Sequence, residues 1–186
     1  AEFVREVLVQ AAGLELGAIQ FEVSFSELPF ERWNDTGSHA VEFRYSPSAE
    51  VPPRPLAKIA SGGEISRVML SLKTVLGPAG GASTLVFDEV DAGIGGGTAT
   101  AVGQRLANLS NDHQVLVVTH LAQVAAFADT HYVVRKISDG GATATVVVPV
   151  EGEQRVRELA RMLSGDETEV AMSRARELLA QRGTVR

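Results

Sequence analysis

The chain has 186 residues, of which 45% are hydrophobic and 22% are charged, and this balance excludes disordered and collagen-like chains. Seventeen basic against 23 acidic residues give a net charge of -6, so bulk electrostatics alone would not draw the chain to a phosphate backbone. The absence of cysteine excludes disulfides, thiolate metal sites and cysteine nucleophiles, and it makes a reducing cytoplasm the default expectation.

The sequence predicts no membrane segment and no signal peptide. No stretch approaches 18 uninterrupted apolar residues, which a membrane-spanning helix would need. Residues 1–5 contain neither a methionine nor the basic start of a secretory signal. We therefore expect a soluble fragment of a longer chain, with no membrane partner.

The N-terminal region predicts one helix followed by two strands. Apolar residues recur at helical spacing over residues 4–11, which indicates a short amphipathic helix ending near Gly13 or Gly17. Apolar and polar residues then alternate at 21–25 and at 41–45, a pattern typical of half-buried strands.

A proline-rich connector precedes the clearest helix. Four prolines between residues 47 and 55 exclude both a helix interior and a central strand, so an extended segment is expected there. Residues 64–76 then repeat apolar side chains at three- and four-residue steps until Gly77-Pro78 ends the pattern.

The remaining chain begins with a strand, a helix and a strand. Residues 84–87 and 114–119 are short apolar runs typical of fully buried strands, and residues 98–109 between them have a helical pattern. This order predicts a parallel βαβ unit. Residues 131–137 and 142–150 predict a hairpin. Two terminal helices are expected to bury Val156, Leu159 and Leu163 on one and Val170, Leu178 and Leu179 on the other.

The run Ser61-Gly62-Gly63-Glu64 stands at the start of the 64–76 helix. A capping box accounts for Ser61 and Glu64, because the serine caps the helix and the glutamate reaches back to it. It does not account for two glycines, each of which weakens a helix by up to about 1 kcal/mol relative to alanine. Glycines there let backbone N–H groups approach an anion such as a phosphate, and on spacing alone both interpretations stay open.

Two adjacent carboxylates, Asp88 and Glu89, follow the apolar run at 84–87. Open α/β sheets bind ligands at the C-terminal ends of their strands. In P-loop ATPases an aspartate at this place helps to hold Mg²⁺, and a following glutamate polarises the attacking water. An acidic turn after a buried strand is the simpler structural alternative.

A glycine-rich loop follows the two acids. Its run Gly93-Ile94-Gly95 has the beginning of a dinucleotide-binding fingerprint. However, Thr98 stands where the fingerprint requires glycine, and Asp112, at the expected distance for the acid, falls in a turn instead of at a strand end. Dinucleotide binding is therefore disfavoured.

His120 comes directly after the second strand of the βαβ unit. It is expected at the same sheet edge as Asp88 and Glu89, where an imidazole could contact a terminal phosphate. A lone histidine is more often structural, so that interpretation also stays open.

Taken in order, these motifs resemble the signature, Walker B, D-loop and switch-histidine motifs of ABC-type ATPases. The runs 56–67, 88–96 and 119–125 are similar in detail to the RecN family, the bacterial SMC-like ATPases of DNA double-strand-break repair. Transporter subunits usually have Pro-Thr after the Walker B acids, whereas this chain has Val90-Asp91. A transporter subunit is therefore disfavoured.

The resemblance covers roughly residues 40–180 and implies the C-terminal half of an ABC-type α/β head. That fold has a largely parallel sheet flanked by helices, with an N-terminal strand region and C-terminal helices. No lysine of the chain follows a glycine, so the Walker A loop is absent and the N-terminal half of the same head becomes an expected partner. Residues 1–17 would be the remnant of a returning coiled-coil arm, and residues 18–186 the head half.

The resemblance also implies a role for each motif in a site for ATP and Mg²⁺. Asp88 would support Mg²⁺ through water, Glu89 would be the general base, and Asp91 of the D-loop would couple two sites. His120 would sense the terminal phosphate of ATP as a second catalytic residue. The implied signature residues, which would bind ATP held by the opposing head, are Ser61, Gly62, Gly63 and Glu64.

The function implied by the resemblance is an ATP-hydrolysing head in DNA repair and recombination. Two heads would form a homodimer around ATP, act on DNA, and work in the cytoplasm at the nucleoid. The chain alone is expected to be inactive because Walker A is missing. A non-catalytic, ATP-gated dimerisation module is the alternative, and intact Asp88, Glu89 and His120 count against it. Residues 151–186 balance seven arginines with seven acids, so DNA binding rests on the resemblance.

Overall fold

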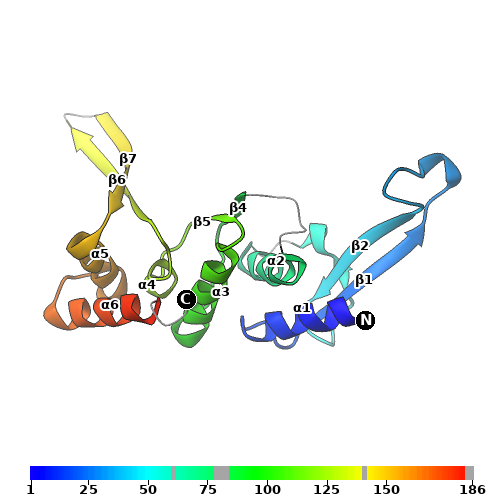
Figure 1. Ribbon diagram of the computed structural model, residues 1–186, viewed down its shortest axis with the longest axis horizontal. Coiled ribbons are helices and arrows are strands. Elements are labelled where there is room, and N and C mark those ends of the chain that lie inside the picture. Colours follow the sequence, from blue (N-terminus) through cyan, green and yellow to red (C-terminus); the bar gives the residue numbers. More distant parts are fainter. Residues whose placement is uncertain (60–61, 78–83, 140–141, 183–186) are drawn as a thin grey trace. The chain divides into compact units, whose positions relative to one another are not determined.

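The computed structural model describes residues 1–59, 62–77, 84–139 and 142–182, which divide into two compact units. Unit 1 comprises residues 1–94 and 112–118, and unit 2 comprises residues 95–111 and 119–186. Figure 1 labels the helices and strands of both units, and each unit is described by itself.

Unit 1 contains two α-helices and five strands among its described residues. Its helices are α1 (Glu2–Ala12) and α2 (Gly62–Leu76), its strands are β1 (Gln20–Glu27), β2 (His39–Ser46), β3 (Arg54–Pro55), β4 (Thr84–Phe87) and β5 (Gln114–Val117), and its short 3-10 turns are η1 (Phe30–Arg32) and η2 (Leu56–Lys58). Strands β1 and β2 pair antiparallel, with Phe21 opposite Tyr45, and the two-residue β3 extends this sheet beyond β2.

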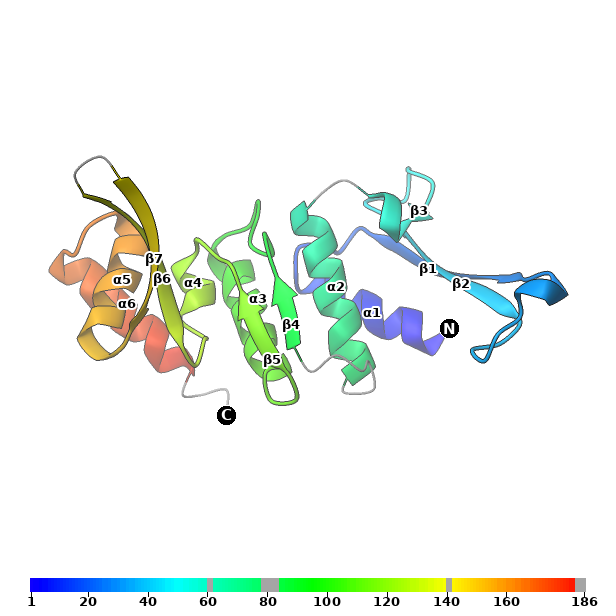
Figure 2. The same cartoon turned by 90° about the horizontal axis from the view of Figure 1, so that it is seen from above.

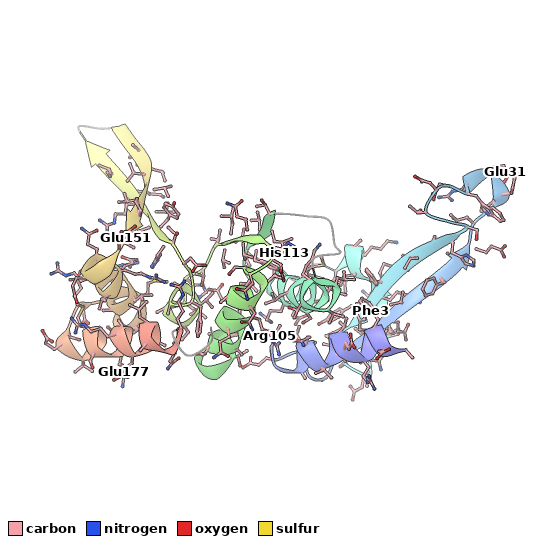
Figure 3. All side chains as sticks on the ribbon, viewed as in Figure 1. Phe3, Glu31, Arg105, His113, Glu151 and Glu177 are labelled. Carbon is pink, nitrogen blue, oxygen red and sulfur yellow. The ribbon has the colours of Figure 1, made fainter. Side chains whose placement is uncertain are left out.

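Helix α1 packs against both α2 and β1, and Figure 2 shows it beside α2. It buries Val7 and Ala11, four residues apart on one helical face. Phe3, which Figure 3 labels on this helix, has its ring 6.5 Å from that of Phe21 and 6.1 Å from that of Phe43. The predicted N-terminal helix is confirmed, while its origin in a coiled-coil arm stays a prediction.

Strands β4 and β5 pair in parallel, with Leu85 opposite Val115. The parallel pairing predicted from the strand, helix and strand order is therefore confirmed. Leu85 and Phe87 are buried, whereas Val86 is 67% exposed because side chains alternate between the faces of a strand. Leu116 is also exposed on β5.

Unit 2 contains four helices and one hairpin among its described residues. The helices are α3 (Gly96–Leu109), α4 (Ala122–Ala125), α5 (Gly152–Ser164) and α6 (Glu169–Arg182), and the hairpin strands are β6 (His131–Asp139) and β7 (Ala142–Val150). The strands pair antiparallel with Val134 opposite Val147, which confirms the predicted hairpin. Its central turn, at 140–141, lies outside the described residues.

The core of unit 2 lies between α4, α5 and α6. Leu159 of α5 is fully buried there together with Ala175 of α6 and Ala126, which follows α4. The predicted terminal helices are confirmed, and Leu163, Leu178 and Leu179 pack against this core. Val170 was expected on the buried face of α6, and this was wrong because it is 66% exposed in the first turn of that helix.

Candidate functional site

The first turn of α2 packs closely on the loop that follows β4. Gly63 is buried, and a β-carbon there would lie 2.8 Å from the β-carbon of Ala92 and 3.1 Å from the carbonyl oxygens of Ala92 and Glu89. No larger residue fits without moving this backbone. Close packing alone therefore explains the glycine at position 63.

Gly62 has a different neighbour, the side chain of Glu89. A β-carbon at residue 62 would collide with the Oε2 atom of that carboxylate and would lie 3.2 Å from its Cδ atom. The carboxylate thus lies against the first residue of α2, where the positive end of the helix dipole favours a negative charge. The structure brings together Gly62 and Glu89, two residues that the sequence singled out separately.

The acid-bearing loop has an unusual backbone. Glu89 has φ of 56°, in the left-handed region that residues other than glycine seldom adopt. The N–H of Ala92 donates to the carbonyl oxygen of Glu89 at 3.0 Å and closes a turn. Asp88 and Glu89 are exposed, whereas Asp91 is buried. The two acids predicted for Walker B are therefore accessible, and the aspartate predicted for the D-loop lies inside unit 1.

Two side chains of α2 bind the backbone of this loop. The Oγ atom of Ser66 donates to the carbonyl oxygen of Asp88 at 2.6 Å. The Nη1 atom of Arg67 donates to the carbonyl oxygens of Ala92 at 2.8 Å and Val90 at 3.4 Å. These contacts fix the loop to the helix that begins with the signature glycines.

Sequence reasoning missed Arg67. It stands four residues after Gly63 and is therefore on the same helical face, the face that α2 buries. This position on the helix could have indicated that Arg67 is buried. A charged side chain in an amphipathic helix is, however, normally expected to face the solvent.

Glu64 contacts Tyr45 of β2. The Tyr45 hydroxyl donates to the Oε2 atom of Glu64 at 3.2 Å, and Tyr45 is 2% exposed. Burial, and then the nearby Glu64 carboxylate, raise the pKa of Tyr45 to about 12. Ser61, the other half of the predicted capping box and the first signature residue, lies outside the described residues.

His120 is exposed and belongs to unit 2, whereas Asp88 and Glu89 belong to unit 1. Just after it, the N–H of Leu121 donates to the Oγ1 atom of Thr119 at 3.0 Å, at the start of α4. The expected approach of His120 to the Walker B acids stays a prediction.

The described residues contain no group of three or more His, Asp or Glu side chains that could hold a metal ion. A lone Asp88 nevertheless suits Mg²⁺, which proteins usually bind through one or two carboxylates together with waters and substrate phosphates. The residues therefore fit a magnesium ion that arrives with a nucleotide.

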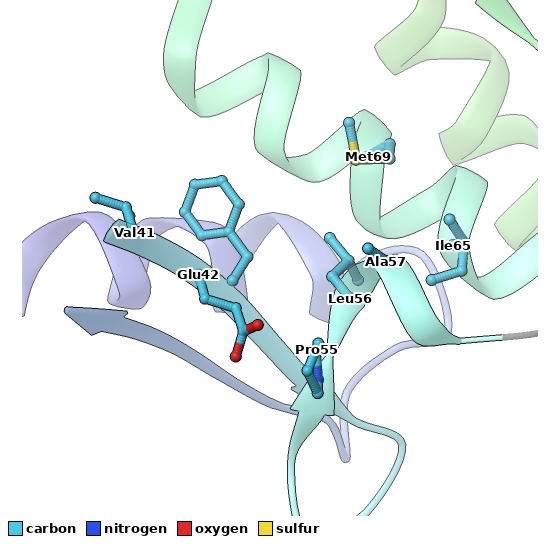
Figure 4. Close-up of a pocket in the computed structure, with 8 residues that line it drawn as sticks. Val41, Glu42, Pro55, Leu56, Ala57, Ile65 and Met69 are labelled. Atoms are coloured by element: carbon cyan, nitrogen blue, oxygen red, sulfur yellow. The ribbon is translucent and has the colours of Figure 1, made fainter. Parts of the chain in front are cut away.

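The pocket in Figure 4, with a volume of about 400 Å³, lies elsewhere in unit 1. Its lining is mainly apolar and comprises Val41, Glu42, Phe43, Pro55, Leu56, Ala57, Ile65 and Met69. None of the described residues to which the sequence assigned chemistry lines this pocket; these are Gly62, Gly63, Glu64, Asp88, Glu89, Asp91 and His120.

Comparisons with known proteins identify the family. The chain is 53% identical over 150 residues to the DNA repair protein RecN of Treponema pallidum and 41% identical over 181 residues to RecN of Halalkalibacterium halodurans. These matches cover 80% and 96% of the chain. The chain belongs to the RecN family. It spans only 26% and 32% of the length of these two RecN relatives.

Solved structures show an SMC-type head fold. The chain resembles the SMC head domain with coiled coil and joint from Pyrococcus yayanosii, at a TM-score of 0.60 and 20% identity, over 87% of this chain and 29% of that one. A second SMC head, from Pyrococcus furiosus and bound to the C-terminal domain of ScpA, matches at a TM-score of 0.50 and 20% identity over 79% of this chain and 34% of its own. The predicted fold, the C-terminal half of an ABC-type head, is confirmed. The largely parallel sheet expected with it is not seen among the described strands, because only β4 and β5 pair in parallel and the other pairs are antiparallel.

Two further searches gave negative results. No family model matches the RecN segment. Within the described residues, no helix has both the length and the apolar character needed to cross a membrane.

Proposed function

We propose that this RecN segment is the C-terminal half of an ATPase head that hydrolyses ATP during DNA double-strand-break repair. The observation that carries the proposal is the packing of the α2 N-terminus on the acid-bearing loop after β4, which gathers Gly62, Gly63 and Glu89 within one unit. Membership of the RecN family supports the same assignment.

In this proposal, the two exposed acids, Asp88 and Glu89, have different catalytic roles. Glu89 is the general base that takes a proton from the water attacking the terminal phosphate, and Asp88 holds the Mg²⁺ that ATP brings, through a water. When bound there, Mg²⁺ would supply positive charge that stabilises the phosphate oxygens in the transition state. His120 contacts the terminal phosphate, and Asp91 couples the two sites of a head dimer.

A second head supplies the signature in trans in the proposed homodimer. Residues 61–64 stand at the start of α2, where backbone N–H groups and the helix dipole favour a phosphate of the partner's ATP. Gly62 is exposed and can make such a contact. Tyr45 holds Glu64 back toward β2 through its hydroxyl group.

The N-terminal half of the head is the other proposed partner, because it would bring the Walker A loop. Val86, Leu116 and Val118 are 67%, 50% and 62% exposed on or beside the parallel strands β4 and β5. Parallel strands are normally covered on both faces, and the RecN relatives are about three to four times longer than this chain. We propose that the missing half covers these residues, and that DNA binding involves parts of the protein outside this acidic segment.

The substitution Glu89→Gln in the full-length protein tests the proposal. We expect ATP binding to persist while the hydrolysis rate falls by about 10²- to 10⁴-fold, because glutamine cannot accept the proton. Glu31→Gln, an exposed acid of η1, is the matched control and should leave the rate unchanged. Normal hydrolysis by Glu89→Gln would contradict the assignment, and ATP-dependent dimerisation without turnover in the wild type would favour the non-catalytic alternative.

A further inference from the structure

Helix α2 holds both ends of the segment 88–92 by hydrogen bonds to its backbone. Ser66 binds the carbonyl oxygen of Asp88 at 2.6 Å, at the start of the segment. Arg67 binds the carbonyl oxygen of Ala92 at 2.8 Å, at its end, and that of Val90 at 3.4 Å. Glu89 lies between these points.

The held segment contains the strained residue. A residue other than glycine in the left-handed region is strained and persists only where its surroundings enforce that conformation. Glu89 has φ of 56°, and the bonds from Ser66 and Arg67 flank it in the sequence. Releasing either bond would let the backbone relax and would turn the Glu89 carboxylate away from its present direction.

Arg67 acts through this backbone and not on a ligand. Its side chain is 6% exposed and is directed to carbonyl oxygens inside unit 1, so it does not reach a nucleotide at the surface. A guanidinium group is suited to this task because it presents several donors in a fixed plane. A lysine would keep the charge but concentrate its donors on one nitrogen.

We propose that Ser66 and Arg67 are positioning residues for ATP hydrolysis, which fix the 88–92 backbone to the signature helix and thereby aim the Glu89 carboxylate at its water. This inference rests on the proposed function, and it gives a role to two residues of the 56–67 run to which neither the motif pattern nor the family resemblance assigned one. It also makes the signature helix and the Walker B loop one rigid piece of unit 1.

The test uses the full-length protein with Ser66→Ala or Arg67→Lys. We expect each substitution to lower kcat by about 10- to 100-fold, because small displacements of a catalytic group are costly, while KM for ATP changes less than about twofold. Lys73→Met is the matched control, since Lys73 is a partly buried cation of the same helix and, among the described residues, donates no hydrogen bond to the loop. It should leave both constants unchanged.

A double substitution separates positioning from a general structural role. In the Glu89→Gln background, Arg67→Lys or Ser66→Ala should lower the residual rate by less than about twofold, because residues that act as a unit are not additive. An equal fold-loss in both backgrounds, or a raised KM with unchanged kcat, would overturn the proposal. Ser66→Ala keeps the test available if Arg67→Lys fails to fold.

The failure of this inference can be distinguished from the failure of the proposed function. If Glu89→Gln hydrolyses ATP normally, the assigned base is wrong and both proposals fall. If Glu89→Gln is slow while Ser66→Ala and Arg67→Lys are normal, the base stands and only the positioning role is overturned.

Discussion

The carboxylate of Glu89 lies against the backbone of Gly62, the first residue of α2. The next residue, Gly63, instead meets the backbone of the same loop, at the carbonyl oxygens of Glu89 and Ala92. A carboxylate can swing aside when a methyl group is added, whereas a packed backbone cannot. The two neighbouring glycines should therefore tolerate alanine very differently.

Gly63→Ala should lower the free energy of unfolding by about 1–3 kcal/mol, because its methyl group would overpack the junction with Ala92. Gly62→Ala should change it by less than about 1 kcal/mol, since the Glu89 side chain moves and alanine favours the helix. Urea unfolding of the 186-residue chain measures both. Equal midpoint shifts for the two variants would contradict the packing described for α2.

Tyr45 should ionise late in a pH titration. Burial and the Glu64 carboxylate raise its pKa from 10.0 to about 12, so folding favours the neutral phenol. The resulting stabilisation is complete below about pH 10 and is lost as the pH rises through 12. Tyr132→Phe leaves Tyr45 as the only tyrosine, so phenolate absorbance of the folded variant should show a midpoint near 12.

Glu64→Gln, combined with Tyr132→Phe, is the control for this titration. The midpoint should fall but stay above 10.0, because burial is the largest cause of the shift and remains. A folded Tyr132→Phe chain that titrates near pH 10 would show that Tyr45 is not buried beside Glu64.

Arg155 of α5 caps the end of α4. Its Nη2 atom donates to the carbonyl oxygens of Ala125 at 3.1 Å, Ala126 at 3.2 Å and Ala128 at 2.7 Å. Arg155→Met leaves these acceptors without this donor and should cost about 1–3 kcal/mol of stability, measurable by urea unfolding. Its control is Arg157→Met.

Arg157 is an exposed cation on the same helix, 3.9 Å from Glu167. An exposed ion pair contributes little, so Arg157→Met should cost less than about 1 kcal/mol. If both arginine variants lose the same stability, the capping role of Arg155 is wrong.

Local patterns predicted most of the fold. The three- and four-residue apolar period predicted α2, although the helix begins at Gly62 instead of residue 64, because its first two residues are glycines and the apolar period begins only at Ile65. The order of strand, helix and strand predicted the parallel pairing of β4 with β5. Helix α4 was missed because its four residues are too few to show a period.

The candidate site was predictable in its residues but not in its contacts. Separate motifs predicted Gly62, Gly63 and Glu89 as site residues. No local sequence pattern indicates that Glu89 contacts Gly62, which is 27 positions away in the sequence. The sequence suggested that Gly63 lets the backbone approach a phosphate. In the structure, close packing against Ala92, in the loop after β4, explains this glycine, and no local pattern indicates that contact. Arg67 was missed because its acceptors are backbone carbonyls, which no sequence pattern marks.

The central claim is that this RecN segment supplies part of an ATPase site and lacks the phosphate-binding loop that completes it. ATP hydrolysis should be measured for the purified chain alone, and again after mixing it with the N-terminal half of the same head. We predict no turnover by the chain alone and restored turnover in the mixture, which Glu89→Gln should abolish. Robust ATP hydrolysis by the isolated chain, or a mixture that binds ATP yet never hydrolyses it, would contradict the account.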